Sequence, residues 1–331
     1  MRSSSNVPQG IAASSSGKDV SRKTDVTTPV EAVAAAGSVR AKDYALLLKP
    51  RVMSLVVFTA FVGLLLAPGT VPVFDAVLGI ICVALGAGAS GSINMWYDRD
   101  IDSQMARTQN RPIPAGRLKP THALWLGITL SIVSVAVMAL VINPVASVLL
   151  AITIAFYVFV YTIWLKRRTP QNIVIGGAAG AFPPMIGWAI VSGSVTIESI
   201  ILFLIIFMWT PPHFWALALY RCGDYEKAGV PMMPVVAGIR ATKIQILAYS
   251  ALLAPTTLLP VMIGMSGWIY CAAAILLNIV LFYHAMRVWR DPSDPITNPG
   301  ATTRPMFFFS IFYLFLIFVF LLVDNAIFVP I

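Results

Sequence analysis

Charged residues are what this sequence has least of. Only 11% of its 331 residues are Asp, Glu, Lys or Arg, whereas an ordinary soluble domain has about 25%. Hydrophobic residues make up 58% of the chain. A soluble fold of this length could not bury so much apolar surface, so the composition excludes an ordinary soluble protein and indicates a protein dissolved in a lipid bilayer.

Cysteine is also scarce. The chain has three cysteines, Cys82, Cys222 and Cys271, far apart and without a Cys-x-x-Cys pair. This spacing indicates neither a zinc site nor a disulfide framework.

The N-terminal segment, residues 1–45, differs from the rest of the chain. It is rich in Ser, Ala, Thr and Val and has no aromatic residue before Tyr44, so it cannot bury enough surface to fold. It also lacks the continuous apolar stretch of a signal peptide. We expect a disordered cytoplasmic tail over 1–45 and a transmembrane domain over 46–331. A mitochondrial transit peptide is the alternative, favoured by Arg2 and Arg22 and opposed by three acidic residues.

Long apolar segments fill the remainder of the chain. A membrane-spanning helix needs about 20 mostly apolar residues. We expect an all-α membrane protein with nine spans. Their approximate bounds are 52–67, 72–95, 121–142, 144–165, 172–192, 197–220, 244–265, 267–287 and 305–328.

Lys and Arg alternate between the two sides of these spans. The connections after the first, third, fifth and seventh spans carry none, and the other connections with the N-terminal tail hold all 23. Cytoplasmic loops carry such an excess. The N-terminus is therefore predicted to be cytoplasmic (or on the matrix side) and the C-terminus on the opposite side. The net charge of +9 follows from this topology, and we expect no nucleic-acid partner.

Two long basic loops follow the second and sixth spans, four spans apart. A weak match between residues 94–98 and 220–224 accompanies this spacing. The pattern predicts two four-helix repeats plus one further helix.

The strongest functional signal is the series Asn94, Asp98 and Asp102. Residues four apart lie on the same face of a helix, so three oxygen-bearing side chains form a stripe at the end of the second span. Mg²⁺ prefers carboxylate oxygens and shares its other positions with water and substrate phosphates. We expect these residues to bind Mg²⁺ and act in catalysis, the alternative being solvated loop charges.

Cationic residues surround this stripe, and guanidinium groups match phosphate oxygens. The second loop adds Asp224, a candidate for a second metal ligand in a catalytic role. The residues predicted to bind a diphosphate are Arg99, Arg107, Arg111, Lys166, Arg221 and Lys227. Carboxylates and arginines at the mouth of an apolar bundle indicate a site for a lipid diphosphate.

The sixth span contains Trp209-Thr-Pro-Pro-His213-Phe-Trp215. Two prolines inside a span kink a helix and free backbone carbonyls. His213 is a candidate ligand-binding residue in this aromatic setting. The alternative is a histidine that hydrogen-bonds a neighbouring helix.

These residues together resemble the UbiA superfamily of intramembrane prenyltransferases, whose first aspartate-rich motif is Asn94-x-x-x-Asp98-x-x-x-Asp102. The likeness covers roughly 42–328 and is closest to the branch that farnesylates haem. The stretches that carry it include 49–52, 94–114, 166–172, 209–215 and 224–232. One departure is that Ala228 stands where many members have the second acid of another Asp-x-x-x-Asp pair, so a symmetrical two-metal site is in doubt there.

The resemblance implies a UbiA-like bundle and a reaction. Farnesyl diphosphate and haem b would give haem O and diphosphate, with Mg²⁺ as cofactor and farnesyl transfer to the 2-vinyl group. His213 and Trp215 become candidates for contact with haem, and haem A synthase a candidate partner. A bacterial inner membrane is expected, with a mitochondrial inner membrane as the alternative. The rival activities are prenyl transfer to an aromatic or chlorin acceptor and, from a different class, transport.

Overall fold

The computed structural model describes residues 41–292 and 300–327. The tail expected over 1–45 lies outside the described residues up to position 40, and its last residues fall in helix α2, Ala41–Leu47. Everything below concerns the unit formed by Ser38–Ile331.

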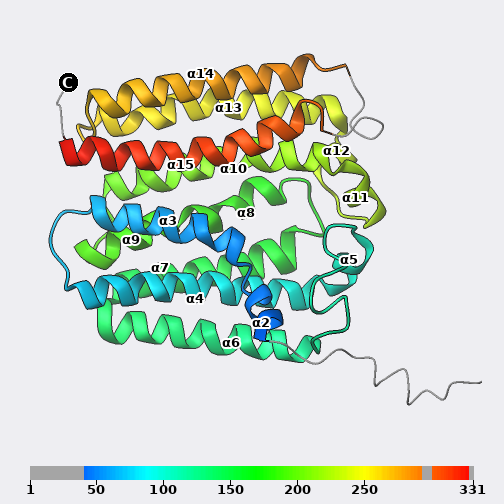
Figure 1. Ribbon diagram of the computed structural model, residues 1–331, viewed down its shortest axis with the longest axis horizontal. Coiled ribbons are helices and arrows are strands. Elements are labelled where there is room, and N and C mark those ends of the chain that lie inside the picture. Colours follow the sequence, from blue (N-terminus) through cyan, green and yellow to red (C-terminus); the bar gives the residue numbers. More distant parts are fainter. Residues whose placement is uncertain (1–40, 293–299, 328–331) are drawn as a thin grey trace, which may run out of the picture. The chain divides into compact units, whose positions relative to one another are not determined.

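The described chain is all helical, without a strand (Figure 1). After α2 the elements are α3 Pro50–Leu66, α4 Val73–Tyr97, α5 Arg99–Gln104, α6 Pro120–Val137, η1 Met138–Ile142, α7 Pro144–Ala155, η2 Phe156–Leu165, α8 Asn172–Ala181, α9 Pro183–Ser192, α10 Ile197–Tyr220, α11 Cys222–Lys227, α12 Met233–Val236, α13 Gly238–Met262, α14 Trp268–Arg290 and α15 Thr303–Ile327. The π-helical segments η1 and η2 continue α6 and α7.

The expected nine spans are confirmed. Eight spans in the described residues are long and apolar enough to cross a membrane, and the bent pair α2–α3 makes a ninth if it is one span. The two parts of that pair meet at an angle of 59°. The chain is therefore a multi-pass membrane protein, and the bend falls beside the residues that form the site described below.

Proline fixes where several helices begin, because it lacks the N–H that an N-terminal turn leaves unpaired. Pro50, Pro120 and Pro144 occupy such positions. At the last of them, Asn143 caps the helix by accepting a hydrogen bond from the Ala146 N–H at 2.8 Å, and its amide donates to the Ala189 carbonyl at 2.8 Å. The short turn between η1 and α7 is thereby fixed to α9.

Glycine allows the closest helix approach, between α3 and α9. A Cβ at Gly187 would lie 1.8 Å from the Ala60 carbonyl oxygen, and one at Gly63 would lie 2.1 Å from that of Pro184. No side chain fits at either position. Small residues thus let these two backbones touch, as they do in many membrane helix pairs.

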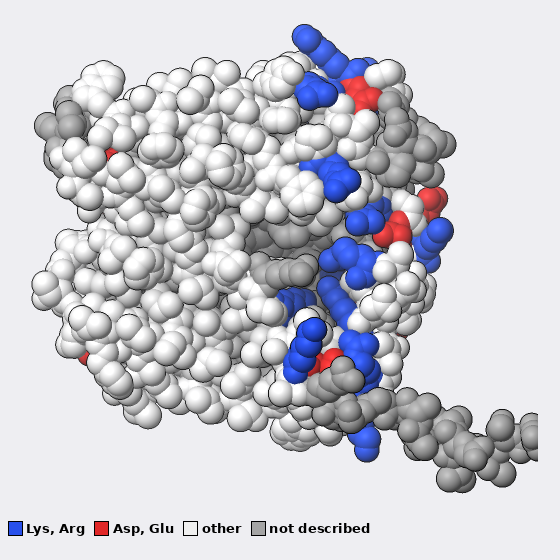
Figure 2. Space-filling model, in the orientation of Figure 1, with Lys and Arg blue, Asp and Glu red and all other residues white. Residues whose placement is uncertain are grey.

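Lys and Arg gather at one end of the helices, the right-hand end in Figure 2. We call it the basic end. The two long loops meet there, because one hydrophobic cluster contains Ile101 and Met105 of the first loop together with Tyr225, Val230 and Met232 of the second. The loops that the sequence singled out therefore lie against each other.

Candidate active site

The predicted Asn/Asp stripe lies at the basic end of α4. Helix α4 ends at Tyr97, but the backbone hydrogen bonds continue, since the Asp98 N–H bonds the Asn94 carbonyl at 2.9 Å and the Asp102 N–H bonds the Asp98 carbonyl at 2.8 Å. All three side chains are buried, Asp98 completely. Burying a carboxylate is costly unless it is paired, so the partners of these acids are decisive.

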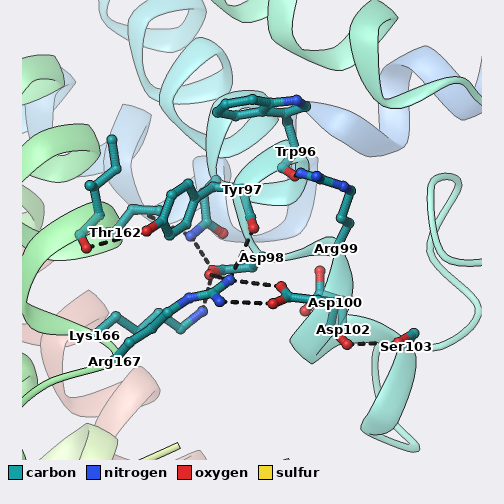
Figure 3. A network of polar contacts seen from close by, with 12 residues as sticks. Trp96, Tyr97, Asp98, Arg99, Asp100, Asp102, Ser103, Thr162, Lys166 and Arg167 are labelled. Carbon is teal, nitrogen blue, oxygen red and sulfur yellow. Dashed lines mark hydrogen bonds and ion pairs between the residues drawn. The ribbon is translucent and has the colours of Figure 1, made fainter.

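Asp98 is the centre of a polar network (Figure 3). Its Oδ2 accepts hydrogen bonds from Lys166 Nζ and, at 2.7 Å, from the Asn94 amide. The Arg167 guanidinium lies 3.6 Å from Oδ1. Oδ1 itself is buried and has no hydrogen-bond partner. The carboxylate therefore keeps one oxygen atom that accepts no hydrogen bond, beside the cations Lys166 and Arg167.

Asn94 is held by Lys49, which was not among the predicted site residues. Lys49 Nζ donates to Asn94 Oδ1 at 2.7 Å, which turns the Asn94 amide nitrogen toward Asp98 and, at 3.2 Å, Thr162 Oγ1. Lys49 has a φ of 53°, the one positive φ of a non-glycine residue in the described chain. Such backbone strain often accompanies functional sites. Glycine at position 91 makes room, since a Cβ there would lie 3.3 Å from Lys49 Cδ.

Asp102 is paired with one of the predicted diphosphate-binding residues. Arg111 NH1 donates to Asp102 Oδ2 at 2.5 Å, and Thr108 Oγ1 bonds the Asp102 carbonyl at 2.8 Å. Nearby, Arg117 Nε donates to the buried Asp43 at 2.8 Å. The Arg117–Asp43 pair ties the loop to α2, so Arg117 has a structural role.

Asp100 and Arg167 form a two-pronged ion pair beside the network, at 2.7 and 2.8 Å (Figure 3). The Arg167 guanidinium also lies over the Tyr97 ring at 4.7 Å. Its hydrogen bonds hold the pKa of the Asp100 carboxyl below the usual range, and the carboxylate in turn raises the pKa of Arg167. The pair joins α5 to the end of η2.

The remaining predicted cations are placed differently. Arg99 donates to the Trp96 carbonyl at 2.7 Å and points away from the Asp98 carboxylate (Figure 3). Arg107 and Lys227 are exposed and form no hydrogen bond or ion pair with the described residues. Arg221 lies over the Tyr220 ring at 4.5 Å. Lys166 and Arg111 are thus the predicted cations that the structure brings to the acids.

Asp224 is half-buried on α11. Its ion pair within the described residues is with Arg221, at a long 3.9 Å. No contact among those residues joins it to Asp98 or Asp102, although the loops that carry these acids pack together.

The two haem candidates face different helices. His213 is buried and stacks on Trp209 and on Phe307 of α15. Trp215 is buried on the other side of α10, with its ring edge-to-face with Tyr249 of α13 at 5.4 Å and its indole N–H unpartnered. Helix α10 therefore separates them.

The donor set fits Mg²⁺. No group of three or more His, Cys, Asp or Glu side chains among the described residues is placed to hold a metal ion, but Mg²⁺ commonly takes one or two carboxylates and completes its shell with substrate phosphates. Asp98 and Asp102 would supply such carboxylates, and Asp98 Oδ1, which lies 3.6 Å from Arg167, accepts no hydrogen bond. A diphosphate would supply the rest.

Residues 56–312 match the model of the UbiA prenyltransferase family. The chain belongs to the UbiA family. Among its relatives is the protoheme IX farnesyltransferase of Parvibaculum lavamentivorans, 58% identical over 289 residues, which cover 86% of this chain and 89% of that protein. The protoheme IX farnesyltransferase of Rhizobium rhizogenes is 56% identical, with 87% and 89% covered.

Solved structures show the same UbiA fold. A digeranylgeranylglyceryl phosphate synthase superposes with a TM-score of 0.71 at 19% identity, covering 86% of this chain and 97% of that one. A UbiA homologue from Archaeoglobus fulgidus, bound to DMAPP and Mg²⁺, gives a TM-score of 0.60 at 18% identity, with 85% and 99% covered. These likenesses confirm the expected bundle.

Proposed function

We propose that this chain transfers the farnesyl group of farnesyl diphosphate to the 2-vinyl group of haem b, giving haem O and diphosphate. The relatives named protoheme IX farnesyltransferase at 54–58% identity support the activity. The observation that carries the chemistry is the buried pairing of two acids with the cations beside them.

Two groups of residues in this network would bind the Mg²⁺ diphosphate: the acids bind the metal and the cations bind the phosphate oxygens. Asp98 and Asp102 supply carboxylate oxygens for Mg²⁺, with Asn94 beside them and Asp224 as the candidate from the second loop. When bound, Mg²⁺ would offset the charge of the diphosphate and help it to leave. The A. fulgidus homologue solved with DMAPP and Mg²⁺ supports this choice of metal. Lys166, Arg111 and Lys49 provide donors for the phosphate oxygens.

Cleavage of the farnesyl C1–O bond leaves an allylic cation and free diphosphate. The cationic side chains stabilise the charge that develops on the leaving oxygen. The vinyl group of haem then forms a carbon–carbon bond to C1, and water adds to the resulting cation and loses a proton, which completes the hydroxyethylfarnesyl group. Apolar walls keep water from the first cation.

The arrangement of charge supports an orientation in the membrane. Lys and Arg gather at one end of the helices (Figure 2), which supports a topology with this end and the N-terminus in the cytoplasm and the C-terminus in the periplasm. The relatives are bacterial, which favours the inner membrane of a bacterium over that of a mitochondrion. Haem A synthase is a candidate partner as the acceptor of the product.

The test is a reconstituted reaction. Purified protein in lipid nanodiscs is incubated with haem b, farnesyl diphosphate and Mg²⁺, and the product is identified by mass. Formation of haem O that stops with EDTA is the expected result. No haem O, with prenyl transfer to an aromatic or chlorin acceptor in the same preparation, would overturn the haem assignment in favour of that acceptor class.

A further inference from the structure

A pocket lies between the end of α14 and the residues that lead into α15, at the basic end of the helices. Its volume is about 400 Å³, within the range of about 300–1,000 Å³ of ligand sites. Figure 1 shows α14 at the upper edge of the bundle and α4 in its lower half, so the pocket is separate from the acid–cation network. Its lining includes Tyr283, Arg287, Arg290, Asp291 and Thr302.

Two arginines supply the positive charge of this pocket. Arg287 and Arg290 are both exposed in the last turn of α14, three residues apart, a spacing that places them on the same face of the helix. Neither forms a hydrogen bond or an ion pair with the described residues. Both guanidinium groups therefore keep their donors for a ligand, and a guanidinium matches phosphate oxygens with two parallel hydrogen bonds.

One acid also lines the pocket, and its bonds fix the wall. Thr302 Oγ1 donates to Asp291 Oδ2 at 2.6 Å, and the buried Lys243 of α13 donates to the Asp291 carbonyl at 2.6 Å. These bonds tie the end of α14 to α13 and to the start of α15. With two arginines and one aspartate as its charged lining residues, the pocket carries a net positive charge and favours an anion.

An exposed stripe on α14 leads from the apolar part of the helix into the pocket. Its members follow one another at spacings of three and four residues, which places them on one helix face. The Arg287 guanidinium lies over the Tyr283 ring at 5.8 Å, and tyrosine is typical of the membrane–water interface. The stripe thus runs from apolar through aromatic to cationic, in the same order as the chain, interface and phosphate of a phospholipid. Its residues are Leu276, Ile279, Tyr283, Arg287 and Arg290.

We infer that this pocket binds the phosphate headgroup of an anionic phospholipid from the leaflet at the basic end, with an acyl chain along Leu276 and Ile279. Basic pockets between helices on the cytoplasmic side of a membrane protein suit such headgroups. Arginines that only set topology need neither a pocket nor an apolar stripe below them. The inference does not rest on the proposed reaction, because neither arginine belongs to the acid–cation network.

The test titrates phosphatidylglycerol onto the purified full chain in detergent and measures the lipid-bound species by native mass spectrometry. Each arginine near an anionic lipid contributes roughly fivefold to binding, so Arg287→Gln with Arg290→Gln should weaken it about thirtyfold. Arg287→Lys with Arg290→Lys keeps the charge and should lose much less. Phosphatidylcholine, which has no net charge, should bind the wild-type protein more weakly than phosphatidylglycerol.

Two controls locate the effect. Lys119→Gln removes an exposed cation at the start of α6, away from the pocket, and should leave phosphatidylglycerol binding unchanged. Leu276→Ser with Ile279→Ser removes the apolar part of the stripe and should weaken the lipid while leaving both arginines in place. Binding of Mg²⁺ with inorganic diphosphate verifies that each variant is folded.

The soluble headgroup separates a lipid from a free phosphate. Glycerol 3-phosphate offers the phosphate without the acyl chains, so it should bind far more weakly than phosphatidylglycerol. Equal binding of the two would overturn the lipid as the ligand. Equal binding of phosphatidylglycerol by the wild-type protein and the double glutamine variant would overturn the pocket as the site. Either result would leave the proposed function standing, because haem O formation is measured separately.

Discussion

The two long loops at the basic end contain the same kinds of residues but use them differently. In the first loop, Asp98 and Asp102 are buried and each contacts a cation: Asp98 pairs with Lys166 at the end of η2, and Asp102 pairs with Arg111 of the same loop. In the second loop, Asp224 is half-buried and its described ion pair is a 3.9 Å contact with its neighbour Arg221. The acids of the first loop are therefore buried and firmly paired, whereas the second loop contributes one loosely held acid.

This difference shows what prepares a site for a charged substrate. A buried carboxylate has to be neutralised, and the lysine and the arginine that pair with Asp98 and Asp102 do so. In the proposed mechanism, Mg²⁺ and diphosphate would replace these ion pairs with new ones. Asp224, which is partly in solvent, has no such requirement and can adjust when substrate arrives.

The largest effect is expected at Asp98. Asp98→Asn removes the carboxylate charge while keeping the shape, so haem O formation should fall by roughly a hundredfold or more, together with Mg²⁺-dependent diphosphate binding. Steady-state rates over a range of Mg²⁺ concentrations measure this. A variant that keeps its rate and its Mg²⁺ dependence would remove Asp98 from the site.

Lys166 is expected to come next. Lys166→Met leaves the buried Asp98 without its closest cation and removes a phosphate donor, so the rate should drop by about tenfold to a hundredfold, with a raised KM for farnesyl diphosphate. Lys119→Met is the control, because Lys119 is an exposed lysine at the start of α6. Equal losses in the two variants would mean that only general surface charge is being measured.

Asp224→Asn sharpens the comparison between the loops. Because Asp224 is loosely paired, its loss should cost about tenfold in rate, less than Asp98→Asn, and the loss should shrink at high Mg²⁺. Rates of both variants in parallel Mg²⁺ titrations decide this. A larger loss from Asp224→Asn than from Asp98→Asn would reverse the ranking of the two loops.

The smallest effect concerns the Asp100–Arg167 pair. Since Arg167 depresses the pKa of Asp100 below its ordinary 3.8, the pair stabilises the fold fully above about pH 4, and this contribution is lost as the pH falls through the lowered pKa. The side chain of Asp100 is 57% exposed, so solvent weakens the effect. Thermal unfolding from pH 3 to 7 should show a small acid-side loss that Asp100→Asn lacks. Identical profiles would show that the pair adds nothing.

Local sequence patterns predicted the spans and the position of the acid stripe. A run of about 20 apolar residues identifies a membrane helix from local sequence alone. A spacing of four residues likewise places Asn94, Asp98 and Asp102 on one face of a helix. The hydrogen-bond partners of these three residues were harder to predict. Lys49 is 45 residues from Asn94 and Thr162 is 68 residues from it, and such pairing depends on how helices pack. Arg99 was predicted from its proximity in sequence to bind the diphosphate; it donates to the Trp96 carbonyl, and its role in binding stays a prediction.

The most direct test of the account measures binding of Mg²⁺ and inorganic diphosphate to the wild-type protein by isothermal titration calorimetry, first separately and then together. Each alone must break the ion pairs of Asp98 and Asp102 without replacing them, so the account predicts weak binding of either and binding at least tenfold tighter of the two together. That gain should disappear in Asp98→Asn. Tight binding of Mg²⁺ alone, or the same gain in Asp98→Asn, would contradict the claim that the acid–cation network of the first loop is the diphosphate site.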